Sequence, residues 1–194
     1  MEEIDDETLM MQYAKGDVQA FTRLYYRHKD SLYRYFLRQT ASPEVAEELY
    51  QEVWGKLIKA HLDYSATSKF TTWLYRIAHN HLVDHYRHNS TATKIITASI
   101  DEPSEELTKS IDLSDPQSNL LESLSQSQQM QQLKQCLQQL PRAQKEAFLL
   151  KHESGLSLKE IALVINETTE NIKSRLRYGL SKLKHCLRLN GESK

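Results

Sequence analysis

The chain has 194 residues, a length that fits one large domain or two small ones. Only five glycines and four prolines interrupt segments rich in Leu, Gln, Glu, Lys and Ala, so the sequence predicts an almost entirely helical fold. A net charge of −1 would discourage nucleic-acid binding if the charge were evenly spread along the chain.

The charge is unevenly spread. Residues 1–100 contain 12 Lys and Arg and 13 Asp and Glu, residues 101–125 contain 1 and 7, and residues 126–194 contain 12 and 6. The acidic centre therefore masks a basic carboxyl-terminal third, which keeps a nucleic-acid partner open.

The sequence also indicates where in the cell the protein is located. Its opening, MEEIDDE, has neither the positive region nor the apolar run of a signal peptide, and no stretch approaches the roughly 20 apolar residues of a membrane span. Cys136 and Cys186 stand among apolar residues at helical spacing, which favours reduced thiols over a disulfide. We therefore expect a cytoplasmic protein.

The first 60 residues predict three helices. A short helix precedes Asp17, which caps a second helix with a break near Lys29. Ser42 as cap and Pro43 as first helical residue begin a third helix that should run to about Ala60. Its outer side gathers Glu44, Glu47, Glu48, Gln51 and Glu52. Such an acidic side is more often solvated than functional, so by itself it indicates no binding site.

Residues 69–88, KFTTWLYRIAHNHLVDHYRH, predict an amphipathic helix. The buried side is expected to carry Phe70, Leu74, Ile77, Ala78 and Leu82. The opposite side carries Arg76, His79, Asn80, Val83 and Arg87, beside the rings of Trp73, Tyr75 and Tyr86. Cations with aromatic rings are the groups that bind single-stranded nucleic acid, although the same pattern also fits an ordinary core and a solvated face.

After His88 the apolar periodicity fails, and residues 90–125 form a predicted flexible, acidic linker rich in Ser, Thr, Asp and Glu. The linker separates predicted domains at residues 1–89 and 126–194. The glutamine-rich run SQSQQMQQLKQCLQQL that follows it is polar but compatible with a helix.

The second domain predicts a helix-turn-helix. Ser157 and Glu160 form a capping box, a turn follows at Asn166 and Glu167, and Thr168 caps the last helix. This helix should bury Ile172, Leu176, Leu180, Leu183 and Leu187, and turn Lys173, Ser174, Arg177 and Ser181 outward. Capping, turn, core and charge agree, so a DNA-reading helix is favoured over a plain helical hairpin.

Two of these stretches resemble bacterial sigma factors of the extracytoplasmic-function group. The segment KFTTWLYRIAHNHLVDHYR resembles the family's promoter-melting segment, LSLKEIALVINETTENIKSRL resembles its carboxyl-terminal helix-turn-helix, and AEELYQEVW resembles its polymerase-binding helix. The resemblance spans most of residues 9–88 and 130–187. It implies an all-α protein of two small helical domains that binds core RNA polymerase, recognises −10 and −35 promoter elements and helps open the DNA.

The resemblance also implies the residues of each contact and the partners. Polymerase contacts fall on Glu48, Gln51 and Glu52. Contacts to the −10 element and strand opening fall on Lys69, Trp73, Arg76, His79, Asn80 and Arg87, and residues 61–68 are expected to receive a flipped base. Contacts to the −35 element fall on Lys173, Ser174 and Arg177, with Thr168 and Arg175 expected to meet phosphates. An anti-sigma factor, commonly membrane-tethered in the family, is a further expected partner. No catalytic activity, cofactor, metal or small-molecule substrate is expected.

The chain departs from the family pattern at two positions, and two other functions stay open. Glu167 stands where an apolar residue is common, and Tyr178 where a basic one is common. One alternative is a free-standing helix-turn-helix regulator that works without polymerase. The other is a helical metal-binding protein that uses His81, His85 and His88, which share one helical side but lack the HExxH pattern.

Overall fold

The structure, a computed structural model, describes residues 4–65, 67–96 and 120–191. Its helices in chain order are α1 (Asp6–Ala14), α2 (Val18–Thr40), α3 (Pro43–Lys59), the 3-10 helix η1 (His61–Asp63), α4 (Phe70–Ile96), α5 (Leu120–Gln138), α6 (Arg142–His152), α7 (Leu158–Ile165) and α8 (Thr169–Gly191). These ranges contain no β-strand, and the all-helical prediction is confirmed.

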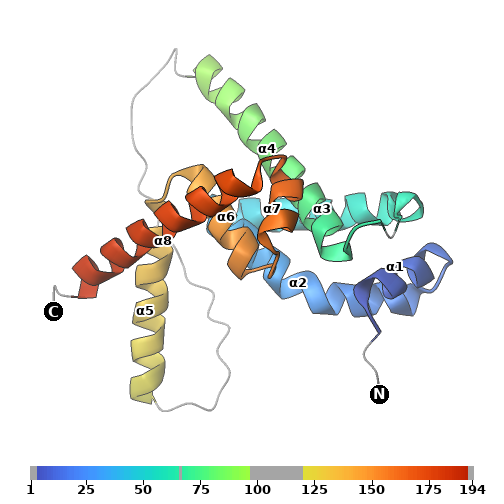
Figure 1. The fold of residues 1–194 in the computed structure, drawn as a ribbon, viewed down its shortest axis with the longest axis horizontal. Coiled ribbons are helices and arrows are strands. Elements are labelled where there is room, and N and C mark those ends of the chain that lie inside the picture. The colour runs from blue at the N-terminus through green and yellow to red at the C-terminus, as the bar shows by residue number, and fades with distance from the viewer. Residues whose placement is uncertain (1–3, 66, 97–119, 192–194) are drawn as a thin grey trace.

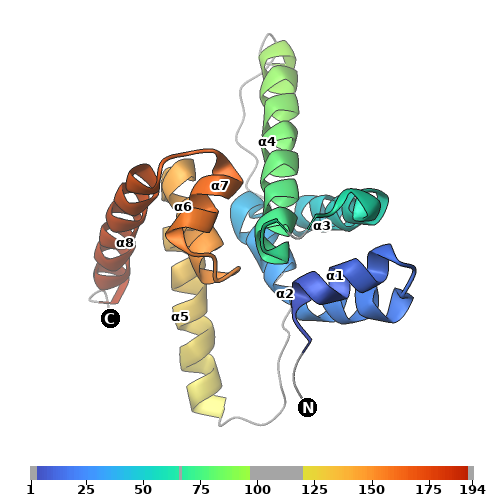
Figure 2. The ribbon, with the colours of Figure 1, turned by 45° about the vertical axis from the view of Figure 1, so that its right-hand side comes forward.

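The helices form two units, which we call the amino-terminal unit (α1–α4) and the carboxyl-terminal unit (α5–α8). In Figure 1, α6 and α7 lie against α2 and α4, whereas α5 and α8 extend away from the amino-terminal unit. Figure 2 shows α8 on the outer side of α6 and α7. None of the described helices is long and apolar enough to cross a membrane.

Side-chain caps fix where the first helices begin. The Asp17 carboxylate accepts from the Gln19 backbone N–H at 2.9 Å, and Ser42 Oγ accepts from the Val45 N–H at 3.3 Å, with Pro43 as the first helical residue. These two predicted starts are confirmed, because an N-cap depends only on residues next to each other in the chain.

Three predicted boundaries were wrong. Helix α2 is continuous through Lys29, because its buried positions keep the helical period from Leu24 to Leu32. Helix α4 continues past His88 to Ile96, and α5 already begins at Leu120, so both helices enter the segment predicted as linker. No glycine or proline stands in either extension to end the helix. The flexibility predicted for residues 97–119 lies outside the described residues.

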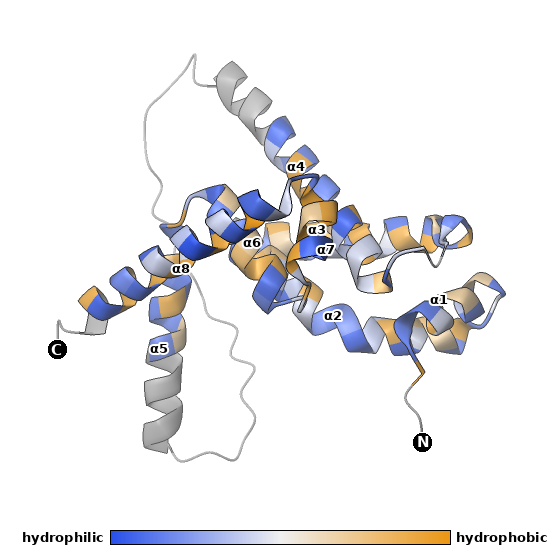
Figure 3. Cartoon of the chain, in the orientation of Figure 1, coloured by the Kyte–Doolittle hydropathy of each residue, from blue (hydrophilic) through white to orange (hydrophobic). Residues whose placement is uncertain are grey.

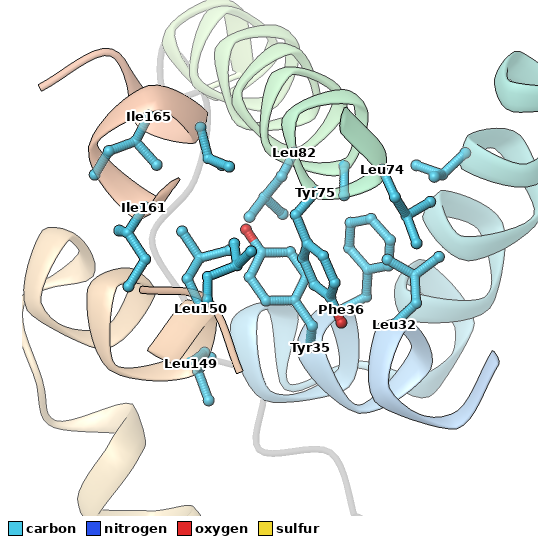
Figure 4. Close-up of a cluster of buried hydrophobic side chains, with 14 of the residues drawn as sticks. Leu32, Tyr35, Phe36, Leu74, Tyr75, Leu82, Leu149, Leu150, Ile161 and Ile165 are labelled. Atoms are coloured by element: carbon cyan, nitrogen blue, oxygen red, sulfur yellow. The ribbon is translucent and has the colours of Figure 1, made fainter. Parts of the chain in front are cut away.

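One continuous hydrophobic cluster joins the two units. Figure 4 shows Tyr35 and Tyr75 at its centre, with Leu82 from α4 and Leu150 and Ile161 from the carboxyl-terminal unit around them. In Figure 3 the apolar sides of α6 and α7 face this centre. Tyr75 is fully buried, so the prediction that its ring lies beside the DNA-facing side of α4 was wrong.

A disulfide joins α5 to α8, which overturns the expectation of reduced thiols. The apolar sides of the two helices pack on each other and bring Cys136 and Cys186 to a Cα–Cα distance of 5.8 Å. Both cysteines were expected among apolar residues, but their pairing depends on two helices that are 50 residues apart in the chain.

Candidate nucleic-acid and polymerase interface

The predicted polymerase contacts lie together on α3. Leu49, Val53 and Leu57 bury one side of the helix, which leaves Glu48, Gln51 and Glu52 exposed on the other. Gln51 Nε2 donates to Glu47 Oε1 at 2.8 Å, one turn away. The side therefore presents three carboxylates and one amide to solvent.

A histidine joins this acidic side from α4. His81 Nε2 lies 2.6 Å from Glu52 Oε2, and Lys56 Nζ lies 2.7 Å from His81 Nδ1. Burial lowers the pKa of His81, and the nearby Lys56 charge lowers it further. The imidazole is therefore neutral at pH 7, and its Nδ1 accepts a hydrogen bond from the Lys56 ammonium group.

The histidines predicted as an alternative metal site border one cavity between α3 and α4. This cavity of about 360 Å³ is lined by Glu48, Leu49, Glu52, Lys56, His81, Asp84, His85 and His88. Among the residues that the structure describes, no three His, Cys, Asp or Glu side chains are grouped so that they could hold a metal ion.

Three of the six residues predicted for the −10 element share an exposed side of α4. Arg76, Asn80 and Arg87 are exposed, and the spacing of four and seven residues places them on one side of the helix. Arg87 Nη1 also lies 3.5 Å from an Asp84 carboxylate oxygen. This side offers two guanidinium groups and an amide, which suits phosphates and base edges.

Trp73 lies at the start of the same helix and is half-buried. Its ring centroid is 5.1 Å from that of Tyr64, in the loop predicted to receive a flipped base, and 6.2 Å from that of Phe70. The Tyr64 hydroxyl donates to the Ser68 carbonyl at 3.3 Å, which ties the two ends of the loop together. Burial and the nearby carboxylates, Glu7 foremost, raise the pKa of Tyr64 to about 12, so its hydroxyl stays protonated.

The carboxyl-terminal unit pairs the remaining two predicted −10 residues with carboxylates; His79 is largely buried there, whereas the Lys69 side chain stays 69% exposed. Lys69 Nζ lies 2.9 Å from Glu160 Oε1 of α7, and His79 Nδ1 lies 2.6 Å from Glu146 Oε1 of α6. The structure therefore does not bring the six residues onto one open surface. The sequence does not predict these two carboxylates as partners, because each is more than 60 residues from the side chain that it pairs with.

Further polar contacts hold α6 against α2. Glu153 accepts from Arg34 Nε at 2.9 Å and also from Arg38, and its side chain is only 6% exposed. Glu146 Oε1 accepts from the Tyr35 hydroxyl at 3.2 Å. Burial and the Glu146 charge raise the pKa of Tyr35 well above its ordinary value.

Two cations of α6 complete the contact between the units. Lys145 Nζ donates to the Gln39 carbonyl of α2 at 3.0 Å, and burial lowers the pKa of this lysine. The Arg142 guanidinium lies 3.4 Å from the centroid of the Tyr86 ring of α4, and the Tyr86 hydroxyl also donates to the Gln39 carbonyl.

The predicted helix-turn-helix is present in α7 and α8. Ser157 Oγ accepts from the Glu160 N–H at 3.3 Å and the Ser157 N–H donates to Glu160 Oε2 at 2.7 Å, which completes the capping box. These bonds, with Lys69 as a further partner, lower the pKa of Glu160 to about 2. Asn166 is left-handed at φ 53°, and Thr168 Oγ1 accepts from the Asn171 N–H at 3.2 Å.

One predicted core position of α8 was wrong. Ile172, Leu176 and Leu183 are buried as expected, but Leu180 is 38% exposed. Gly179 takes the buried position instead, because α6 comes so close that a Cβ at Gly179 would lie 3.5 Å from Cβ of Gln144.

The predicted −35 residues lie along the outer side of α8. Thr168, Lys173, Ser174 and Arg177 are exposed. Arg175 instead pairs with the Glu167 carboxylate, which also accepts from Asn171 Nδ2. Asn171 was not among the predicted residues, although an amide in the first turn of a recognition helix is a signal for base contact.

Family models match both units. Residues 24–91 match the model described as Sigma-70 region 2, and residues 130–183 match the model described as Sigma-70, region 4. The chain belongs to the extracytoplasmic-function group of sigma-70 factors. This sigma factor thus has a role in promoter recognition with RNA polymerase, and neither the free-standing regulator nor the metal-binding protein is favoured.

Relatives match the sigma factor over most of its length. It is 27% identical to the ECF RNA polymerase sigma factor SigK of Mycobacterium sp. (strain KMS) over 188 residues, which cover 94% of this chain and 91% of that one. It is 28% identical to the RNA polymerase sigma-H factor of Pseudomonas aeruginosa over 175 residues, with 88% of each chain covered.

Solved structures share the fold. The sigma factor RpoE of Bartonella quintana, in complex with the anti-sigma factor NepR, matches with a TM-score of 0.69 at 21% identity, over 87% of this chain and 96% of that one. CnrH in complex with the cytosolic domain of CnrY matches with a TM-score of 0.66 at 20% identity, over 95% and 97%. At these identities the likeness concerns the fold alone.

Proposed function

We propose that this sigma factor is a dissociable, non-enzymatic subunit of RNA polymerase that works in the cytoplasm, docks through α3 and reads promoter DNA with α4 and α8. One observation carries the proposal: a single chain holds a region 2 match and a region 4 match, each with a polar, cationic helix side open to solvent. A regulator that only binds duplex DNA has no use for the first of these sides.

The acidic side of α3 supports the docking role. Glu48 and Glu52 offer carboxylates and Gln51 offers an amide, which together bind an arginine-rich partner surface well. Glu52 is also flanked by His81, whose neutral ring leaves the carboxylate charge uncancelled. We assign these three residues to core polymerase.

The exposed side of α4 supports strand opening. Arg76 and Arg87 suit the phosphates of a single strand, and Asn80 can bond a base edge. Extruding a base costs a few kcal/mol, and stacking on an aromatic side chain returns about 1–3 kcal/mol per base. The Tyr64 ring lies in the loop at which we place that base, and the Trp73 ring packs against it.

The pairing of Lys69 and His79 with carboxylates implies that the described arrangement is a closed one. Glu146 holds the largely buried His79 where a DNA phosphate would otherwise bind, and Glu160 competes with phosphate for the exposed Lys69. We propose that the units separate when polymerase and promoter bind. An anti-sigma factor, like NepR in the complex with RpoE, would act on this chain by favouring the closed arrangement.

Runoff transcription with core polymerase, on fragments of the source genome, tests the proposed function. We expect the full chain to direct core polymerase to specific start sites. The variant Glu52→Lys should weaken binding to core at least about tenfold, because it places a cation against a cationic partner. The control Asp30→Lys makes the same charge change on α2, away from this side, and should bind core normally. A chain that binds promoter fragments alone but never redirects core would instead be a free-standing regulator.

A further inference from the structure

Glu167, which departs from the family pattern, contacts two side chains of the recognition helix. Its Oε2 accepts from Asn171 Nδ2 at 2.9 Å, and its Oε1 pairs with a guanidinium nitrogen of Arg175. Glu167 itself is held in the turn, because its backbone N–H donates to the Ala162 carbonyl at 3.0 Å. One carboxylate therefore connects the turn to the first and second turns of α8.

The chemistry of this contact fixes the orientation of the Asn171 amide. Hydrogen bonds from Asn171 and Arg175 lower the pKa of Glu167, so its side chain is a carboxylate that can only accept. Asn171 must then turn its NH₂ group toward Glu167, which leaves Oδ1 and the second N–H on the outer edge of the amide. The Asn171 backbone N–H, bonded to Thr168 Oγ1, holds the same residue from the other side.

That outer edge has the pattern that reads adenine. An asparagine amide recognises adenine in the major groove by accepting from N6 and donating to N7. Asn171 is exposed in the first turn of α8, the part of a recognition helix that meets base edges. A flipped amide, with Oδ1 toward the turn, would face Glu167 with two acceptors and no donor.

The contact also changes the role of Arg175. An uncompensated carboxylate in this turn would repel the DNA backbone, and the Arg175 guanidinium neutralises it. Arg175 is therefore less available for a phosphate than the exposed Lys173 and Arg177.

We propose that Glu167 is a positioning residue that fixes the Asn171 amide and thereby makes Asn171 an adenine-selective contact of the −35 element. The proposal rests on the proposed function, in which α8 enters the major groove of that element.

The test is transcription by the full chain with core polymerase, on a promoter library randomised through the −35 element. The wild type should prefer adenine, on one strand, at one position by at least about fivefold, the lower end for a bidentate base contact. Asn171→Ala should abolish the preference at that position alone. Glu167→Gln should also abolish this preference, because glutamine can bond either orientation of the Asn171 amide. It should leave the thermal midpoint unchanged, because glutamine has nearly the same shape as glutamate. The double variant should show no further loss.

Control variants separate positioning from charge and from folding. Glu170→Gln makes the same charge change in the first turn of α8 and should keep the adenine preference. Arg177→Ala should weaken transcription but keep the adenine preference at the position that Asn171 contacts. The inference is overturned if Glu167→Gln keeps the preference, or if Asn171→Ala changes no position while the wild type still selects a −35 sequence. If the wild type selects no −35 sequence at all, the proposed function itself fails, and this inference fails with it.

Discussion

Replacing Glu153, the C-cap residue of α6, by glutamine should weaken the contact between the two units. The Glu153 carboxylate is almost fully buried and bonds Arg34 and Arg38 of α2. Glutamine has nearly the same shape but no charge, so Glu153→Gln would leave two neighbouring guanidinium groups without a counter-ion. Burial and the neighbouring Arg34 charge also lower the pKa of Arg38.

The stability lost in Glu153→Gln can be estimated from the exposure of the Glu153, Arg34 and Arg38 side chains. A hydrogen bond to a charged group contributes about 1.5–3 kcal/mol, and the Arg38 side chain, only 17% exposed, should lose that amount in full. The Arg34 side chain is 48% exposed, so solvent reduces its share to below about 1 kcal/mol. The expected loss is about 2–4 kcal/mol, which is a factor of roughly 30 to 1000 in the equilibrium between closed and open arrangements.

Urea unfolding, followed by circular dichroism and by small-angle scattering, measures this loss. Because the hydrophobic cluster is continuous, we expect the wild type to unfold in one transition. Glu153→Gln should lower the unfolding free energy by the stated amount, and scattering should show an expanded chain before helix is lost. The control Asp30→Asn also removes one negative charge, but from an exposed pair with Lys29 on α2, and should change stability by less than about 0.5 kcal/mol. A Glu153→Gln chain as stable and as compact as the control would show that this carboxylate does not hold the two units together.

Three further predictions concern pH and the disulfide. The pKa of His81 is lowered in the folded chain, so the unfolded chain is protonated at His81 first as the pH falls. The free energy of unfolding should therefore decrease as the pH drops below 6.5. In urea titrations, His81→Gln should make the free energy of unfolding less dependent on pH in this range. The pKa of Glu160 is about 2, so its contribution to stability is present above pH 4.5 and should be lost as the pH falls toward 2. Hydrogen exchange of α7 should follow this loss of protection, and Glu160→Gln should remove most of its dependence on pH. The Cys136–Cys186 bond closes a loop of about 50 residues, so its reduction should lower the unfolding free energy by about 2–4 kcal/mol. The control is Cys186→Ser, whose stability should not change when the reductant is added.

Local chemistry explains which parts of the fold were predictable. Asp17, Ser42 and the Ser157–Glu160 box mark helix starts correctly, because each cap bonds an N–H two or three residues away. The end of α4 was missed, because it depends on the absence of a stop signal rather than on the presence of one.

Long-range contacts explain which parts of the site were not predictable. Exposure of Arg76 and Asn80 follows from helical periodicity, and the structure agrees. The contact of Glu146 with His79 does not follow from periodicity, because no pattern in α4 indicates which helix of the other unit lies against it. The disulfide was missed for the same reason: spacing within α5 and α8 shows an apolar side but not its partner.

The hydrophobic cluster shared by α2, α4, α6 and α7 sets a limit on how tightly this chain can bind polymerase. If only the open arrangement is competent to bind, the apparent Kd equals the intrinsic Kd divided by the open fraction. A chain that is open one time in a hundred would bind about a hundredfold more weakly than the same chain held open. Substitutions that loosen the cluster around Leu82, Leu150 and Ile161 should therefore destabilise the closed arrangement and, by the same free energy, strengthen binding to polymerase.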